Sequence, residues 1–419
     1  MSEDPGERLL LAVDGNSLLH RSHHAHAAGG VTDAWGRPTW GLRGLVSLIA
    51  SAAARLTPDA LVVGFDCTAD SVRRADYPDY KAGRPDKHAD LRHQLDQAPG
   101  LLREAGLPVV VPPGYEADDV LASAAALARR HGWRCVVVTS DRDAFALIDE
   151  TTSVLRVIDG GIDGSPLLTP ARLPTLCGVR AGQYRDFAAL RGDSSDNLPG
   201  PKGIGPKTAA RLLAVFDGVA DALAALDDGR TDEVAAAVGQ AAAARLGTPQ
   251  ARAHLERNLR LMTMRDDVTL PELGELHLPV DATRLRTALA GRGITFVDAL
   301  WALTGGAPPA HGVAWQAERD AAELVAAAGA PGGPELDPGS GSAAGADEGA
   351  IEDPADPAGP ALTAESVAAL LGAVTITSTL DLPEAPTSEP GPRPTKPSRR
   401  PTGRRRGRAQ PDERQLSLF

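Results

Sequence analysis

The chain has 419 residues, three cysteines and a net charge of −12, and its length exceeds that of one typical domain. The widely spaced Cys67, Cys135 and Cys177 form no CxxC pair, which excludes a cysteine zinc site and favours a reducing compartment. The acidic N-terminus and the short Leu9–Val13 run exclude a signal peptide and a membrane span, so we expect a cytoplasmic protein with no membrane partner.

Short β-rich runs alternate with helical patterns along the first part of the chain. The runs predict strands at Leu9–Asp14, Ala60–Asp66, Leu107–Val111, Arg134–Asp141 and Ser153–Asp159. The helical patterns lie at Gly41–Leu56, Ala89–Glu104 and Ala117–His131. Continuous apolar runs alternating with helices predict an α/β fold with a mostly parallel sheet.

The composition changes twice further along the chain. Residues 183–305 indicate helices joined by Gly/Pro turns. From Gly306 onward, Ala, Gly, Pro, Asp and Glu dominate, and such a stretch buries too little apolar surface to offset the entropy of ordering it. We expect a disordered tail at 306–419, with one short helix at Thr363–Gly372.

Acidic residues gather where the predicted strands end. Asp14, Asp66 and Asp141 each end a strand, and the carboxyl ends of parallel strands share one rim of a sheet. Asp193 and Asp196 are spaced i,i+3, which predicts a helical turn that points both carboxylates the same way. The additional acids are Glu116, Asp118, Asp119, Asp143, Asp193 and Asp196. Each acid alone could simply end a strand or cap a helix, but nine together repel one another unless cations neutralise them. Mg²⁺ or Mn²⁺ suits such oxygen ligands.

Seven motifs resemble those of the 5′ nucleases related to the N-terminal domain of bacterial DNA polymerase I and to flap endonucleases. They are LLAVDGNSLLHR, VVGFD, YKAGR, GYEADDVLA, VVVTSDRD, GDSSDNLPG and GIGPKTA, which span about residues 8–305. The resemblance implies a PIN-like fold with a catalytic α/β domain at 8–182 and a helical DNA-binding region at 183–305.

The resemblance also implies hydrolysis with two Mg²⁺ ions, for which Mn²⁺ can substitute, leaving a 5′-phosphate. One ion would be held by Asp14, Asp66, Glu116 and Asp118. The second would be held by Asp141, Asp143 and Asp193, with Asp119 and Asp196 completing the acidic network.

A basic segment with tyrosines follows the second predicted strand, and this composition suits phosphate contacts and base stacking. By the resemblance, residues of about 67–115 form a helical arch, in which Lys81 and Arg84 approach the scissile phosphate and Tyr80 stacks on a base. Arg73 and Arg74 would bind DNA. The alternative is a solvated charged helix.

The segment Gly203-Ile204-Gly205 predicts a tight loop before a helix that starts near Pro206. Glycines let a backbone approach a phosphate, and a helix N-terminus offers it free N–H groups. The segment resembles a helix-hairpin-helix at about 195–215, often with bound K⁺, although a plain helix–helix turn would also need glycine. The DNA-binding residues would be Lys202, Gly203, Gly205, Lys207 and Thr208.

Four neighbouring histidines, His20, His23, His24 and His26, invite a metal interpretation. The family usually carries aromatic or small residues there, so we interpret them as helix surface or packing.

The chain ends in QLSLF after a basic run, Arg393–Arg408, that would add nonspecific DNA affinity. QLSLF resembles the peptide that binds the bacterial sliding clamp, and the clamp-binding residues would be Gln415, Leu416, Leu418 and Phe419. A flexible linker of ~110 residues would span roughly 55–60 Å and tether the nuclease near its substrate.

Together these features predict a stand-alone 5′→3′ exonuclease with flap endonuclease activity in DNA replication and repair. Its substrates would be 5′ flaps, nicked or branched duplex and single-stranded 5′ ends. One rival is a noncatalytic DNA- and clamp-binding factor that retains the fold, and the intact set of carboxylates argues against it. The other is a ribonuclease of the related PIN-like fold, and the arch and the helix-hairpin-helix argue against that.

Overall fold

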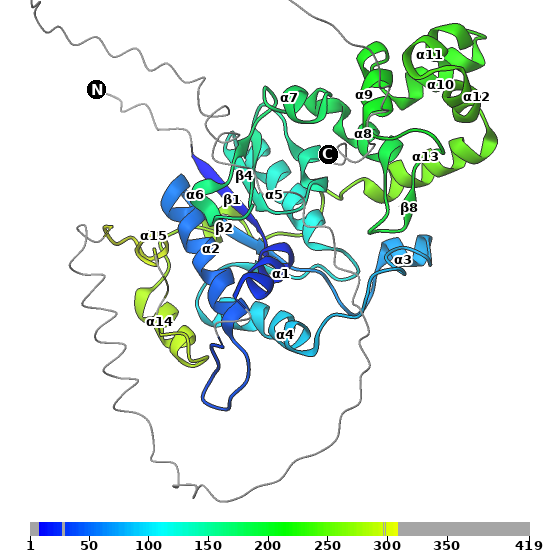
Figure 1. Ribbon diagram of the computed structural model, residues 1–419. Helices are drawn as coiled ribbons and strands as arrows, with labels where there is room; N and C mark the ends of the chain where they lie inside the picture. The colour runs from blue at the N-terminus through cyan, green and yellow to red at the C-terminus, as the bar shows by residue number, and fades with distance from the viewer. Residues whose placement is uncertain (1–7, 27–29, 296, 298, 309–419) are drawn as a thin grey trace, which may run out of the picture. The chain divides into compact units, whose positions relative to one another are not determined.

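The computed structural model describes residues 8–26, 30–295, 297 and 299–308 (Figure 1). The predicted helix at Thr363–Gly372, the basic run Arg393–Arg408 and the terminal QLSLF lie outside these residues. None of the described helices combines the length and the apolar character that a membrane crossing would need.

A six-stranded sheet of order β3-β2-β1-β4-β5-β6 organises the N-terminal part of the chain. Five strands are parallel, as predicted: β1 (Leu9–Asp14), β2 (Ala60–Gly64), β3 (Val109–Val110), β4 (Arg134–Thr139) and β5 (Thr152–Arg156). The sixth, β6 (Leu167–Leu168), was not predicted and pairs antiparallel with β5 at the edge. Four of the predicted strands end early, and as a result Asp66 and Asp141 lie in loops two residues beyond the last residues of β2 and β4.

Helices cover both faces of the sheet because neighbouring residues of β1 point to opposite sides. Leu10 and Ala12 pack with α5 (Ala117–Arg130), whereas Leu11 and Val13 pack with α2 (Trp40–Leu56) and α4 (Ala89–Glu104). The first helix, α1 (Gly15–His26), follows β1 directly and packs against α2. All three predicted helices are confirmed, with ends that differ by at most one residue from the prediction. The short helices of this part are α3 (Val72–Asp76), α6 (Gly161–Gly164) and α7 (Leu173–Cys177), with 3-10 turns at η2 (Asp143–Leu147) and η3 (Ala181–Gln183).

The rest of the described chain is mostly helical, as predicted. Its helices are α8 (Tyr184–Arg191), α9 (Pro206–Val215), α10 (Val219–Asp227), α11 (Thr231–Val238), α12 (Gln240–Leu246) and α13 (Pro249–Met262), followed by the 3-10 turn η4 (Leu273–Glu275). A small two-stranded sheet, β7 (Gly192–Asp193) and β8 (Leu198–Pro199), lies between α8 and α9. The last helices, α14 (Ala282–Ala290) and α15 (Trp301–Thr304), pack back onto α4 and α2 beside the sheet.

Candidate metal centre

The predicted meeting of strand-end carboxylates is present at the rim of the sheet. Asp14, at the end of β1, is buried and accepts hydrogen bonds from the backbone N–H of Ser17 (2.9 Å) and the hydroxyl of Thr139 (2.7 Å). Burial nevertheless raises the pKa of Asp14 to about 7, and the charges of Asp66 and Asp141 act in the same direction. These carboxylates are therefore close enough to repel one another.

Asp118, in the first turn of α5, is the member of this group that the protein satisfies least. Its Oδ1 is buried and has no hydrogen-bond partner among the described residues. Burial raises the pKa of Asp118 well above its ordinary value, and Asp141 and Asp14 add to the shift. A buried carboxylate oxygen without a donor is costly unless a cation neutralises it. This orphaned oxygen therefore fits a bound divalent ion.

A second group of carboxylates lies beside the first. One oxygen from each of Asp143, Asp193 and Asp196 lies within 4.8 Å of the others. Burial raises the pKa of Asp143 to about 7, with further contributions from Asp141 and Asp193. The resemblance assigned Asp141 to this group and left Asp196 in the outer network, whereas the structure brings Asp196 into the group itself.

The helical turn predicted at residues 193–196 is wrong. These residues form the turn of a β-hairpin between β7 and β8, in which Asp193 Oδ1 accepts a hydrogen bond from the backbone N–H of Ser195 (2.8 Å). Left-handed residues flank the turn, Gly192 with φ 74° and Asn197 with φ 57°. A Cβ at Gly192 would lie 2.3 Å from the backbone nitrogen of Gly200, so the hairpin needs glycine there.

Sequence reasoning overlooked Asn16 and Thr139 as supporting residues. Asn16 donates to Asp66 Oδ2 (2.7 Å) and accepts from the backbone N–H of Asp66 (3.1 Å), while Ala117 N–H donates to the other carboxylate oxygen (2.9 Å). Thr139 donates to Asp14. The only sequence signal for these two residues is their position in the motifs. Asn16 lies two residues after Asp14 in the first motif, and Thr139 lies two residues before Asp141 in VVVTSDRD.

Asp119 and Arg73 form a buried ion pair, contrary to the roles expected for them. The Arg73 guanidinium binds both oxygens of Asp119 at 2.7 Å, and those oxygens also accept the backbone N–H groups of Glu116 and Arg265. Arg73 Nε donates to the carbonyl of Leu261 (2.9 Å). Asp119 is thus saturated by protein donors, and Arg73 faces inward rather than toward a DNA phosphate.

The predicted arch segment consists of α3, a run of turns and α4. Tyr80 is only 4% exposed and packs against Leu198 and Leu261, so it is not available to stack on a base. Its hydroxyl instead donates to Glu116 (3.1 Å), and burial, with Glu116, raises the pKa of Tyr80 and keeps it protonated. Arg74 is exposed, as a DNA contact requires.

Lys81 and Arg84, the two cations of the predicted arch, each form an ion pair with one of the clustered carboxylates. Lys81 Nζ is 2.9 Å from Glu116 Oε1, and Arg84 forms an ion pair with Asp196. Burial alone would lower the pKa of Lys81, but Glu116 and Asp196 raise it above its ordinary value. Lys81 adopts the left-handed backbone conformation (φ 59°), which is strained for a non-glycine residue and is common at functional sites.

The predicted loop before α9 is confirmed, because α9 begins at Pro206 and Gly203 has φ 90°. Lys202, Gly205 and Lys207 are exposed around this loop, Thr208 is half-buried, and Ile204 is buried beneath it. Gly205 has an ordinary backbone conformation and open space where a side chain would lie. As the N-cap of α9, this position would also accept serine or asparagine, so the fold does not require glycine there, whereas close approach of a ligand would.

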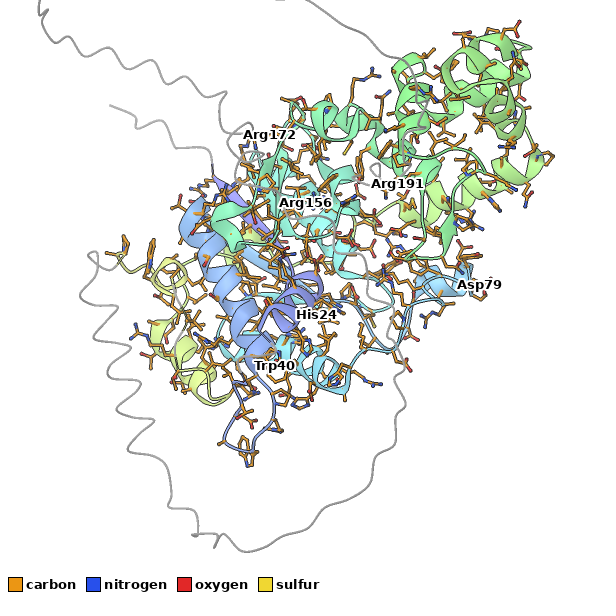
Figure 2. All side chains as sticks on the ribbon, in the orientation of Figure 1. His24, Trp40, Asp79, Arg156, Arg172 and Arg191 are labelled. Atoms are coloured by element: carbon orange, nitrogen blue, oxygen red, sulfur yellow. The ribbon has the colours of Figure 1, made fainter. Side chains whose placement is uncertain are left out.

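The histidines of α1 agree with the packing interpretation where their side chains are described. His23 is buried with its ring centroid 5.4 Å from that of Trp40, and His24 is exposed on the same helix (Figure 2). Burial lowers the pKa of His20 to about 4, so this ring is neutral.

Comparison with known proteins identifies related sequences over most of the described chain. The family model for the 5′-3′ exonuclease N-terminal resolvase-like domain matches residues 9–171, and that for the 5′-3′ exonuclease C-terminal SAM fold matches residues 179–282. DNA polymerase I of Mycobacterium tuberculosis is 35% identical over 271 residues, which are 65% of this chain and 29% of the relative. The thermostable DNA polymerase I of Thermus aquaticus is 39% identical over 224 residues, 54% of this chain and 26% of the relative.

The chain thus aligns with under a third of the length of these curated relatives. Among solved structures, the T5 D15 protein co-crystallised with metal ions is 20% identical, with a TM-score of 0.49, and the match covers 76% of this chain and 99% of that one.

Proposed function

The chain belongs to the 5′-3′ exonuclease family, and from this membership we propose that it hydrolyses phosphodiester bonds of DNA from 5′ ends and at 5′ flaps. The observation that carries the proposal is the pair of adjacent carboxylate groups at the rim of the sheet, one with an unsatisfied buried oxygen on Asp118. We place this activity in DNA replication and repair.

We assign the carboxylates to two divalent ions, Mg²⁺ in the first place and Mn²⁺ as a substitute. One ion would be held by Asp14, Asp66, Glu116 and Asp118, and the other by Asp141, Asp143, Asp193 and Asp196. When bound, such ions lower the pKa of a water molecule and stabilise the departing 3′ oxygen. Asp119 is left out because each of its oxygens already accepts two hydrogen bonds from protein donors, whereas Glu116 Oε1 accepts one, from Lys81.

Lys81 and Arg84 supply the positive charge of the protein at the same place. Their contacts with Glu116 and Asp196 put both cations at the carboxylate groups, where a scissile phosphate would lie. Fixed cations that face developing negative charge lower the barrier of phosphoryl hydrolysis. Lys81 retains its proton because the neighbouring carboxylates raise its pKa.

We assign duplex binding to the loop before α9. Lys202 and Lys207 are exposed beside it, and Gly205 leaves room for a phosphate at the N-terminus of α9. Thr208 and Gly203 complete the set, with K⁺ as a candidate ion at the loop. Such contacts recognise the backbone, so binding should depend on DNA structure and steeply on salt rather than on base sequence.

The clamp partner rests on the sequence of the last residues alone. We propose that Gln415, Leu416, Leu418 and Phe419 bind a sliding clamp. Deletion of Gln415–Phe419 should weaken clamp binding and leave cleavage by the isolated enzyme unchanged. Clamp affinity that survives the deletion would remove this assignment.

A substrate panel tests the proposed activity. Wild-type protein in Mg²⁺ should cleave 5′-flap DNA and nicked duplex, release 5′-phosphate products and lose activity in EDTA. Preference for RNA would favour the PIN-like ribonuclease. DNA and clamp binding without metal-dependent cleavage would favour a noncatalytic factor.

A further inference from the structure

The charges of three arginines near η2 act on the thiol of Cys177, which lies at the end of α7. Arg156 ends β5 and Arg191 ends α8 (both residues are labelled in Figure 2), and both elements pack against η2, which Arg142 directly precedes. Burial raises the pKa of Cys177, while the charges of Arg191, Arg142 and Arg156 all act to lower it. The three guanidinium groups therefore lie within electrostatic range of one thiol.

Arg156 is the member of this cluster whose positive charge is least compensated. Its Nε is buried without a hydrogen-bond partner among the described residues. Burial lowers the pKa of Arg156, and Arg142 and Arg21 lower it further. Its guanidinium lies 5.9 Å from the ring centroid of Phe145, but this contact gives Nε no acceptor.

The other two arginines differ in their partners. Arg142 is exposed and forms no ion pair within the described part of the chain, whereas Arg191 Nη2 lies 3.8 Å from Asp143 Oδ1. Arg21, the fourth cation nearby, is already paired with Asp159 (2.5 Å). Arg142 and Arg156 thus have no ion-pair partner within the described part of the chain, and Arg191 links their cluster to Asp143.

We propose that Arg142 and Arg156, with Arg191 at their border with Asp143, bind a backbone phosphate of the substrate DNA next to the cleavage site. This assignment rests on the proposed function. A guanidinium presents a planar fork of N–H donors that matches phosphate oxygens, and an anion there would supply the acceptor that Arg156 Nε lacks. Free inorganic phosphate and a released 5′-mononucleotide share this chemistry, so the test must separate them from DNA.

Cys177 provides a reporter for the site that does not require catalysis. In a Cys67→Ser background, Cys177 is the half-buried thiol that remains within the described residues, since Cys135 is buried. We expect an anionic methanethiosulfonate reagent to modify Cys177 faster than a neutral one. Arg156→Gln and Arg142→Gln should each slow both reagents, because the thiolate becomes less populated, and should slow the anionic reagent about fourfold more than the neutral one, because an attractive charge is lost.

Arg185→Gln is the matched control, because Arg185 is an exposed arginine on the same helix as Arg191. It should alter neither rate. Circular dichroism and thermal unfolding should show that each variant keeps the wild-type fold. Equal effects of Arg185→Gln and Arg156→Gln on the anionic reagent would contradict the site.

Protection of Cys177 identifies the ligand. In EDTA, which prevents cleavage, 5′-flap DNA should protect Cys177 at concentrations at which inorganic phosphate and 5′-dAMP do not. Arg156→Gln should abolish this protection and raise the KM for flap DNA by about 10-fold, with little change in kcat. Protection by the small anions but not by DNA, or DNA protection that persists in Arg156→Gln, would overturn the proposal.

Different results would refute the proposed nuclease activity and the proposed phosphate site. DNA protection that depends on Arg156, without any metal-dependent cleavage, would refute the nuclease activity and support the phosphate site. Normal cleavage without DNA protection of Cys177 would refute the phosphate site alone.

Discussion

At the scale of a single residue, the negative charge of Asp118 should destabilise the metal-free protein. Its Oδ1 is buried without a hydrogen-bond partner among the described residues, and its pKa is raised by burial and by Asp141 and Asp14. Asp118→Asn keeps the shape and removes the charge. At pH 8 in EDTA we therefore expect this variant to unfold about 2–4 °C above the wild type in calorimetry.

An exposed aspartate provides the comparison. Asp163→Asn, on α6, should leave the unfolding temperature unchanged, because its carboxylate is in solvent. A lower unfolding temperature for Asp118→Asn than for Asp163→Asn in EDTA would show that the charge of Asp118 does not destabilise the metal-free protein.

Asp14 and Asp143 predict a pH dependence for the metal-free protein. Their pKa values are about 7 in the folded chain against an ordinary value of 3.8, so the unfolded chain loses these protons first as the pH rises. Their contribution to the free energy of unfolding is therefore present below about pH 4 and is lost as the pH rises to about 7.

Bound ions should reverse this trend, because they require ionised carboxylates. We expect Mg²⁺ to raise the unfolding temperature at pH 8 and to have little effect at pH 5.5, as measured by thermal scans with Mg²⁺ and with EDTA. The Asp14→Asn/Asp143→Asn variant should lose most of the Mg²⁺ effect at pH 8. An equal Mg²⁺ effect at both pH values in the wild type would contradict the assignment.

At the scale of elements, two ion pairs hold α3 of the arch segment, one to α5 and one to α13, and they differ in burial. Arg73 in α3 is buried against Asp119 of α5 and also binds the Leu261 carbonyl of α13. Arg260 of α13 is paired with Asp76 of α3 at 2.7 Å in an exposed position. Arg73→Ala leaves a buried charge uncompensated and should lower the free energy of unfolding by about 3–5 kcal/mol.

The exposed pair is the internal control. Arg260→Ala should cost less than about 1 kcal/mol, because solvent screens the pair. Urea denaturation measures both values, and a cost for Arg73→Ala no larger than that for Arg260→Ala would refute the structural role of Arg73.

The loop before α9 separates a glycine needed by the fold from one that the fold does not require. Gly203 has φ 90°, and a Cβ there would lie 2.7 Å from Arg245 Nη1, so Gly203→Ala should destabilise the protein by about 1 kcal/mol or more. Gly205→Ser preserves an N-cap for α9 and meets open space, so it should leave stability unchanged. It should still weaken duplex binding by fluorescence anisotropy, and unchanged binding would argue against a phosphate at this loop.

The sequence predicted elements with a strong local signal and missed contacts between distant segments. The continuous apolar runs located five strands, and the strand-end aspartates located the rim of the metal centre. The inward position of Arg73 depends on Asp119, 46 residues away, and the burial of Tyr80 depends on Leu198 and Leu261. No periodicity or spacing in a single sequence reports such partners.

At the scale of the molecule, the boundary between catalytic and helical parts is less simple than the sequence suggested. The helices α14 and α15 fall within the predicted region 183–305, yet Leu285, Leu289 and Leu303 belong to the core cluster that contains Leu11 and Val13 of β1. Amphipathic spacing identifies which residues of a helix are buried, but it does not identify the element that covers them.

Cleavage of 5′-flap DNA under single-turnover conditions tests the central claim, that the carboxylates at the sheet rim form a metal-dependent nuclease site. Wild-type protein and Asp163→Asn should cleave the flap at equal rates that rise with Mg²⁺ concentration and vanish in EDTA. Asp118→Asn should bind the flap with unchanged affinity and cleave it at least about 100-fold more slowly, because it removes a proposed metal ligand while leaving the fold intact. Cleavage by Asp118→Asn at the wild-type rate, or cleavage by the wild type that persists in EDTA, would contradict the account.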